Sequence, residues 1–157
     1  MIVLLTEMSK RIRAIALGLI EHKGHIFVSR GRDSVTEETF YRFLGGGIEF
    51  GETSEAALTR EFMEEVQAKL TAVEYITCLD NIFTYKGKPK HELIQLFRAQ
   101  FVSPAFYQLE ETFDLVEGDR IEQAVWLATD KVFSGDCRLV PESCMQYLDV
   151  PSGCSMH

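Results

Sequence analysis

Hydrophobic and polar residues alternate along the first third of the chain in short runs that are typical of β-strands. Residues 12–20 and 25–29 predict two strands, and Gly24 between them predicts a hairpin turn. The polar stretch 31–39 predicts a loop, and residues 40–44 predict a further short strand that leads into a run of glycines. The chain therefore starts with a small antiparallel unit.

The second half of the chain is also rich in predicted strands. Residues 73–79, continued at 82–85, and the alternating stretch from about 93 to 101 predict two long strands, separated by a turn signal at 86–89. Residues 122–127 predict a last strand.

Two further segments complete this reading. Residues 103–120 predict the longest loop, and residues 141–148 predict a closing helix. Strands interrupted by one central and one C-terminal helix favour the α/β class, with an α/β/α sandwich around a mixed sheet. A chain of 157 residues predicts a single domain, with a core over about 11–149.

The central helix carries acidic residues on one face. Thr53 predicts its N-cap. At 100° per residue, Glu61, Glu64 and Glu65 fall within roughly a 100° arc. The opposite side carries an apolar stripe, made of Leu58, Phe62, Val66 and Leu70. Carboxylates that share a face repel one another, and a hard divalent cation compensates for that repulsion best.

Glycine and charged residues recur at fixed spacings in the segment 46–68, at Gly46, Glu52, Arg60, Glu61, Phe62, Glu64 and Glu65. These positions match the pattern Gly-x5-Glu-x7-Arg-Glu-U-x-Glu-Glu-x-Gly-U, where U is a bulky apolar residue. The segment therefore resembles the Nudix box, the signature of the Nudix hydrolases, a family that includes MutT-like proteins. Gln67 stands where the box has glycine, and Ala68 is small for an apolar position. A glutamine at a helix end with positive φ costs about 1 kcal/mol and removes no metal ligand.

The resemblance implies hydrolysis of a nucleoside diphosphate linked to another moiety, by water and under divalent-metal control. It implies Mg²⁺ or Mn²⁺ held by Glu61, Glu64 and Glu65, with the backbone carbonyl of Gly45 completing the metal shell. Arg60 and Glu52 carry over as an orienting ion pair that belongs to the catalytic machinery.

Residues outside the box are less constrained by the resemblance, and no substrate-binding residue is assigned. Many relatives recruit a further acid from a loop, for which Glu117 is the first choice ahead of Glu110, Glu111 and Glu122. The arginines that could contact phosphate or base are Arg13, Arg30, Arg32 and Arg42, and the aromatic residues that could stack on a base are Phe40, Tyr41 and Tyr85.

Composition narrows the range of partners. The net charge of −8 argues against binding to a nucleic-acid backbone, and it also disfavours a polyphosphate unless metal ions invert the local field. A small nucleotide-derived substrate is what the resemblance implies. No apolar run approaches the length of a membrane span, and residues 1–5 are too short for a signal peptide. Four cysteines without C-x-x-C spacing fit a reducing cytoplasm, which is the expected location.

Two questions stay open at this level. A catalytically silent Nudix-fold module that senses a nucleotide is the alternative to an enzyme, and the three convergent carboxylates argue against it. The sequence does not choose between nucleoside triphosphates, nucleotide sugars and dinucleoside polyphosphates, and it leaves the oligomeric state open, a homodimer included.

Overall fold

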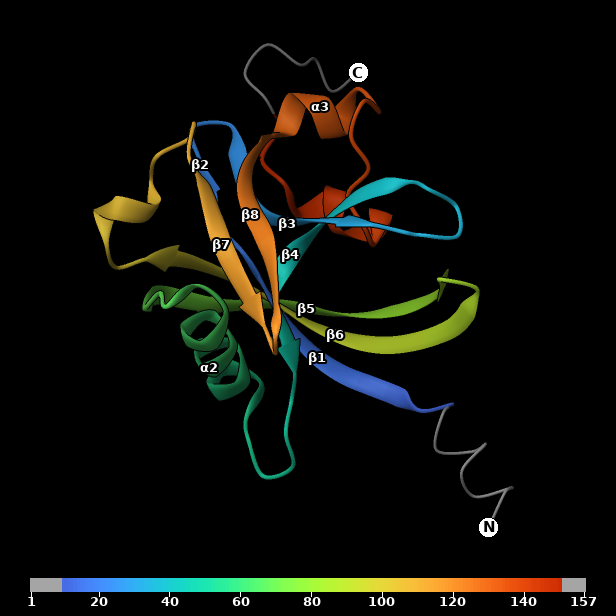
Figure 1. The fold of residues 1–157 in the computed structure, drawn as a ribbon. Coiled ribbons are helices and arrows are strands. Elements are labelled where there is room, and N and C mark those ends of the chain that lie inside the picture. Colours follow the sequence, from blue (N-terminus) through green and yellow to red (C-terminus); the bar gives the residue numbers. More distant parts are fainter. Residues whose placement is uncertain (1–9, 151–157) are drawn as a thin grey trace.

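The computed structural model describes residues 10–150. Residues 1–5, on which the expectation of no signal peptide rests, and Cys154 lie outside this range. Eight strands form one mixed sheet, in the order β5-β6-β1-β4-β3-β8-β7 with β2 paired to β3 (Figure 1). The strands are β1 (Ile12–Leu19), β2 (Glu21–His22), β3 (His25–Arg32), β4 (Thr39–Gly47), β5 (Leu70–Tyr85), β6 (Lys88–Phe101), β7 (Thr112–Glu117) and β8 (Arg120–Ala128).

The helical elements lie on both sides of this sheet. The long helix α2 (Ser54–Val66) packs against β1, β4 and β7, and the short helix α3 (Thr129–Phe133) lies at the opposite side of the molecule (Figure 1). Two short 3₁₀ turns, at Pro104–Phe106 and Glu142–Tyr147, complete the elements of the described residues. The architecture is the predicted α/β sandwich around a mixed sheet. In the described range, no helix is long and apolar enough to cross a membrane.

Strand β4 joins the two halves of the sheet. Its second half pairs with β1, for example Leu44 with Gly18, while its first half pairs with β3, for example Phe43 with Val28. In Figure 1 the β3–β4 connection and the β5–β6 hairpin project toward the same side, away from α2. The glycine run is therefore placed where the two halves of the sheet meet.

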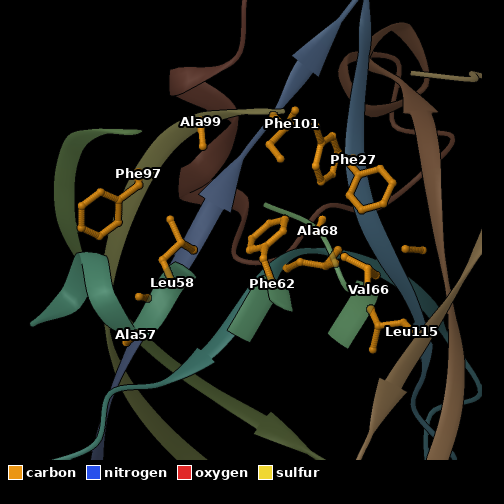
Figure 2. Close-up of a cluster of buried hydrophobic side chains, with 14 of the residues drawn as sticks. Phe27, Ala57, Leu58, Phe62, Val66, Ala68, Phe97, Ala99, Phe101 and Leu115 are labelled. Carbon is orange, nitrogen blue, oxygen red and sulfur yellow. The ribbon is translucent and has the colours of Figure 1, made fainter. Parts of the chain in front are cut away.

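The apolar face of α2 holds the helix on the sheet. Leu58, Phe62 and Val66 are almost fully buried, and Figure 2 shows them among the aromatic side chains of Phe27, Phe97 and other core residues. A side chain at Gly18 would lie 2.9 Å from the ring of Phe62, so the helix approaches β1 closely at this point.

Four sequence-based expectations are wrong. The strand at Ile12–Leu19 does not form a hairpin with β3, because β1 lies between β4 and β6, and the partner of β3 across the Gly24 turn is the short β2. Residues 103–120 are not one loop, because the alternating segment 112–117 forms β7 and turns Leu115 into the core. The closing helix is a 3₁₀ turn over Glu142–Tyr147. Leu70 is not part of the helical stripe, because α2 ends at Val66 and Leu70 begins β5.

Both ends of α2 are capped. At the N-terminus, the amide of Ala56 donates to Thr53 Oγ1 at 3.1 Å, as predicted. At the C-terminus, Gln67 adopts the left-handed conformation, with φ 54° and ψ 39°. Its amide donates to the carbonyl of Met63 and its side-chain Nε2 to the carbonyl of Glu64. The helix therefore ends where the box predicts, with a residue that has a Cβ in a conformation that favours glycine.

An arginine ties the loop after β4 to the helix. Arg60 donates from Nε to Glu52 Oε2 and from Nη2 to Glu52 Oε1, both at 2.8 Å, and Nη2 also reaches the carbonyl of Gly47 at 2.9 Å. The amide of Glu49 donates to Glu52 Oε1 at 3.0 Å. These bonds stabilise the charged carboxylate and lower the pKa of Glu52 to about 2, with the hydrogen bonds from Arg60 as the largest cause.

We expect Gln67→Gly to raise the free energy of unfolding by up to about 1 kcal/mol, because glycine adopts positive φ without strain. Gln67→Ala is the matched control, since it keeps the strain and loses only the hydrogen bond to the Glu64 carbonyl. Urea denaturation of the three proteins measures both effects. A Gln67→Gly variant less stable than the Gln67→Ala variant would contradict this account of the helix end.

We expect Glu52→Gln to lower the free energy of unfolding at neutral pH, because Arg60 loses its bidentate charged partner. The pKa of Glu52 is lower in the fold than in the unfolded chain, so its stabilising effect is present above the ordinary glutamate value and is lost as the pH falls toward 2. Denaturation of both proteins between pH 7 and pH 2 tests this. The difference in stability should shrink as the pH falls, and a constant difference would show that the charge of Glu52 plays no part.

Candidate active site

The glycine run brings β4 so close to β1 that no side chain fits between them. Gly45 has φ 145°, and a Cβ on it would lie 1.9 Å from the carbonyl oxygen of Ala16. A Cβ on the next residue, Gly46, would lie 2.5 Å from the carboxyl carbon of Glu61. The carboxylate of Glu61 therefore lies directly against the backbone of the glycine run, beside Gly45.

Glu65 lies one helical turn beyond Glu61 and is buried. Its exposed fraction is 7%, although it is a charged residue on an amphipathic helix. Burial is the largest cause that raises the pKa of Glu65, to about 9, and the nearby carboxylates of Glu61, Glu117 and Glu64 raise it further. An ionised Glu65 therefore has an excess of negative charge around it, which a cation would compensate.

Glu64 is placed differently from the other two acids. It is exposed, and its Oε2 accepts from Arg60 Nη1 at 3.3 Å, while the same nitrogen donates to Glu61 Oε1 at 3.0 Å. All three carboxylates lie on the regular helix α2, but their exposure differs: Glu61 and Glu65 are little exposed, whereas Glu64 is exposed. Within residues 10–150, no three acidic, histidine or cysteine side chains are close enough to form a ready metal cage.

The donor set nevertheless fits a hard divalent cation. Carboxylate and carbonyl oxygens are the ligands that Mg²⁺ and Mn²⁺ prefer. Glu61 and Glu65 supply carboxylates of low exposure beside the glycine run, and Gly45 can be approached closely because it has no side chain. Glu64 would join them by leaving Arg60. The roles predicted for Glu61, Glu64, Glu65 and Gly45 stay predictions that this geometry supports.

A cleft of about 1620 Å³ opens beside these residues. Its lining includes Glu65 and the run from Gly45 to Gly47 at one end, and it extends between the β3–β4 connection and the β5–β6 hairpin. Nine of the 16 Lys and Arg residues line it, but only eight of the 24 Asp and Glu residues. The excess negative charge of the protein therefore lies mainly outside the cleft, which can accept an anionic ligand.

The arginine and aromatic candidates divide between the cleft and other surfaces. Arg13, Arg32 and Arg42 line the cleft, and a Cβ on Gly47 would lie 3.1 Å from Arg13 Nη2, so the guanidinium of Arg13 lies over the glycine run. Arg30 instead donates to Gln123 on the neighbouring strand.

Among the aromatic candidates, Phe40 and Tyr85 line the cleft and contact each other edge to face, with ring centroids 5.8 Å apart. Tyr41 lies outside it, in a pocket of about 330 Å³ that Arg138 also lines.

Of the acids outside the box, Glu117 is the one that contributes to the charge around Glu65. Glu117 is the last residue of β7 and lines the cleft. Glu122 also lines the cleft and forms an ion pair with Arg120. Glu110 and Glu111 are exposed at the turn before β7. The position of Glu117 supports its choice as the additional acid and leaves its role a prediction.

Sequence reasoning did not single out Glu92 and Asn81, which also line the cleft. Glu92 is 6% exposed and stands in phase with Ile94 and Leu96, two core residues of β6. A charged residue on the buried face of a strand is a signal of a special environment, and it was missed because the strand was expected to begin after it.

Comparison with known proteins bears on the family and the fold. The protein-family model described as the NUDIX domain matches residues 9–142 of this chain. A MutT NUDIX hydrolase from Burkholderia pseudomallei superimposes with a TM-score of 0.57 at 24% identity, over 77% of this chain and 86% of that one. A NUDIX hydrolase from Nitrosomonas europaea gives a TM-score of 0.60 at 16% identity, over 92% of this chain and 100% of that one.

A third structure, the ORF135 protein of E. coli, gives a TM-score of 0.55 at 20% identity, over 87% of this chain and 86% of that one. At these identities the structures show a shared fold, and the family model supplies the assignment. The chain belongs to the NUDIX family of hydrolases.

Proposed function

We propose that this protein hydrolyses a pyrophosphate bond in a free nucleotide derivative, with Mg²⁺ or Mn²⁺ bound by Glu61, Glu64, Glu65 and the carbonyl of Gly45. The observation that carries the proposal is the continuity of the cleft, which leads from the buried Glu65 along the glycine run to Arg13 and onward. Acidic groups for a cation and basic groups for phosphates therefore line one space.

The protein's own groups have distinct parts in this chemistry. A bound divalent cation supplies charge neutralisation and a water of lowered pKa. Glu61 and Glu65 would hold that charge in place. Arg60 and Glu52 fix the loop against the helix, and Arg13 lies where a phosphate beside Gly47 would be. Glu117 faces the same centre from β7 and is the proposed additional acid.

The cleft and its charge support the proposed substrate class. Members of this family generally use divalent metal ions and act on small nucleotide-derived compounds. The cleft admits a nucleoside triphosphate, a nucleotide sugar or a dinucleoside polyphosphate. The protein's net charge of −8 disfavours a long nucleic-acid backbone. Action as a single cytoplasmic domain, alone or as a homodimer, is part of the proposal.

We expect Glu65→Gln to lower kcat by at least about 100-fold, because it removes a charge that stabilises the reacting centre. The free energy of unfolding should stay the same or rise, since glutamine has no buried charge to desolvate. Glu55→Gln, on an exposed residue of the same helix, is the matched control. Full activity of Glu65→Gln, or full activity in excess chelator, would exclude this mechanism.

We expect hydrolysis of at least one compound in a panel of (deoxy)nucleoside triphosphates, ADP-ribose, nucleotide sugars and dinucleoside polyphosphates, with Mg²⁺ or Mn²⁺ present. Chromatography of the products identifies the bond that is cleaved. Tight binding of a panel member without cleavage would favour the silent sensor module over the enzyme. Cleavage restricted to capped RNA would contradict the electrostatic argument on substrate size.

A further inference from the structure

A buried carboxylate with a free oxygen lies in the cleft, away from the acidic residues of α2. Glu92 Oε1 accepts from Arg42 Nη2 at 2.7 Å and from Asn81 Nδ2 at 3.2 Å. The residue is 6% exposed and lines the cleft. Among residues 10–150, Glu92 Oε2 has no hydrogen-bond donor, and it is not sealed from solvent.

This group is built from both halves of the sheet. Arg42 comes from β4, while Glu92 and Asn81 are cross-strand partners on β6 and β5. Two donors fix the carboxylate, so its second oxygen has a defined direction. Burial of a carboxylate costs free energy unless its oxygens accept hydrogen bonds. A ligand that donates a hydrogen bond to Oε2 would satisfy the oxygen that has no donor.

The charge of Glu92 decides which part of a nucleotide it can meet. A negative carboxylate repels a phosphate, whereas Arg13, its cross-strand partner on β1, attracts one. The guanidinium of Arg13 lies over Gly47, on the side of the catalytic residues. Tyr85 lies nearer the tip of the β5–β6 hairpin than Glu92, and it offers aromatic surface to the cleft together with Phe40. A nucleotide with its phosphates near Arg13 and a neutral hydrogen-bond donor near Glu92 would therefore match the positive charge of Arg13 and the negative charge of Glu92.

We propose that Glu92 Oε2 accepts a hydrogen bond from the nucleoside moiety of the substrate, from a base N–H or a sugar O–H, and that Arg42 and Asn81 are positioning residues for this contact. The inference rests on the proposed function and adds a specificity residue to it. It requires that binding of the nucleoside, and not of the phosphates, depends on Glu92.

Nucleoside monophosphates test this without turnover, because they contain no pyrophosphate bond. Dissociation constants of AMP, CMP, GMP, UMP, ribose 5-phosphate and inorganic phosphate are measured by calorimetry for the wild-type protein and for Glu92→Gln. Glu74→Gln, an exposed glutamate of β5 outside the cleft lining, is the matched control. Melting temperatures establish that the variants are folded.

We expect Glu92→Gln to weaken the binding of at least one monophosphate by about tenfold or more, and that of inorganic phosphate by less than about twofold. An equal loss for ribose 5-phosphate assigns the donor to the sugar, and an unchanged ribose 5-phosphate assigns it to the base. Glu92→Asp, which keeps the charge and withdraws the carboxylate by one methylene, should show the same pattern and serves if Glu92→Gln does not fold.

Three results would overturn the proposal: no monophosphate bound by the wild-type protein, equal monophosphate affinities of wild type and Glu92→Gln, or an equal loss for inorganic phosphate. A purely structural role of Glu92 predicts a lower melting temperature with unchanged relative affinities. A failure of the proposed function is distinct, because it would appear as absence of pyrophosphate cleavage by a protein that still binds the monophosphates.

Discussion

At Gly45 the backbones of β4 and β1 approach until only a hydrogen atom separates the glycine Cα from the neighbouring strand. A Cβ there would lie 1.9 Å from the Ala16 carbonyl oxygen. This contact fixes the position of Gly46, against which Glu61 lies, and of Gly47, whose carbonyl accepts from Arg60. The placement of the acidic helix relative to the cleft follows from this one close approach of two strands.

The helix and its neighbouring loop were predictable because their signals are local. Thr53 caps its helix through a side chain three residues from the amide it accepts, and Gln67 occupies the left-handed end that the box assigns to glycine. Arg60 and Glu52 pair as the resemblance implies. Eight residues or fewer separate the partners in each case, so a pattern along the chain was sufficient.

The cleft could not be predicted in the same way, because its parts come from distant strands. The contact between Arg42 and Glu92 spans 50 residues. Glu117 adds to the negative charge around Glu65 from β7, a strand in a segment that the sequence predicts to be a loop. The alternation in residues 112–117 is short, and the apolar Val116 lies on the exposed side with Thr112 and Asp114, so the sequence alone does not show that Leu115 enters the core. The roles of Glu92 and Leu115 depend on their burial, and burial is a property of the assembled sheet.

The pairing of β1 with β6 has a consequence for how the protein reaches its working state. Among the named strands of residues 10–150 this is the one parallel pair, and it joins Ile12 to His91. The β5–β6 and β7–β8 hairpins close short loops and can form early, whereas the parallel pair must close a loop of nearly the whole first half of the chain. Arg13 and Glu92 become neighbours only in that step. During synthesis, a chain that has not yet reached β6 would carry the acidic helix without its cleft, and the cleft would form late in folding.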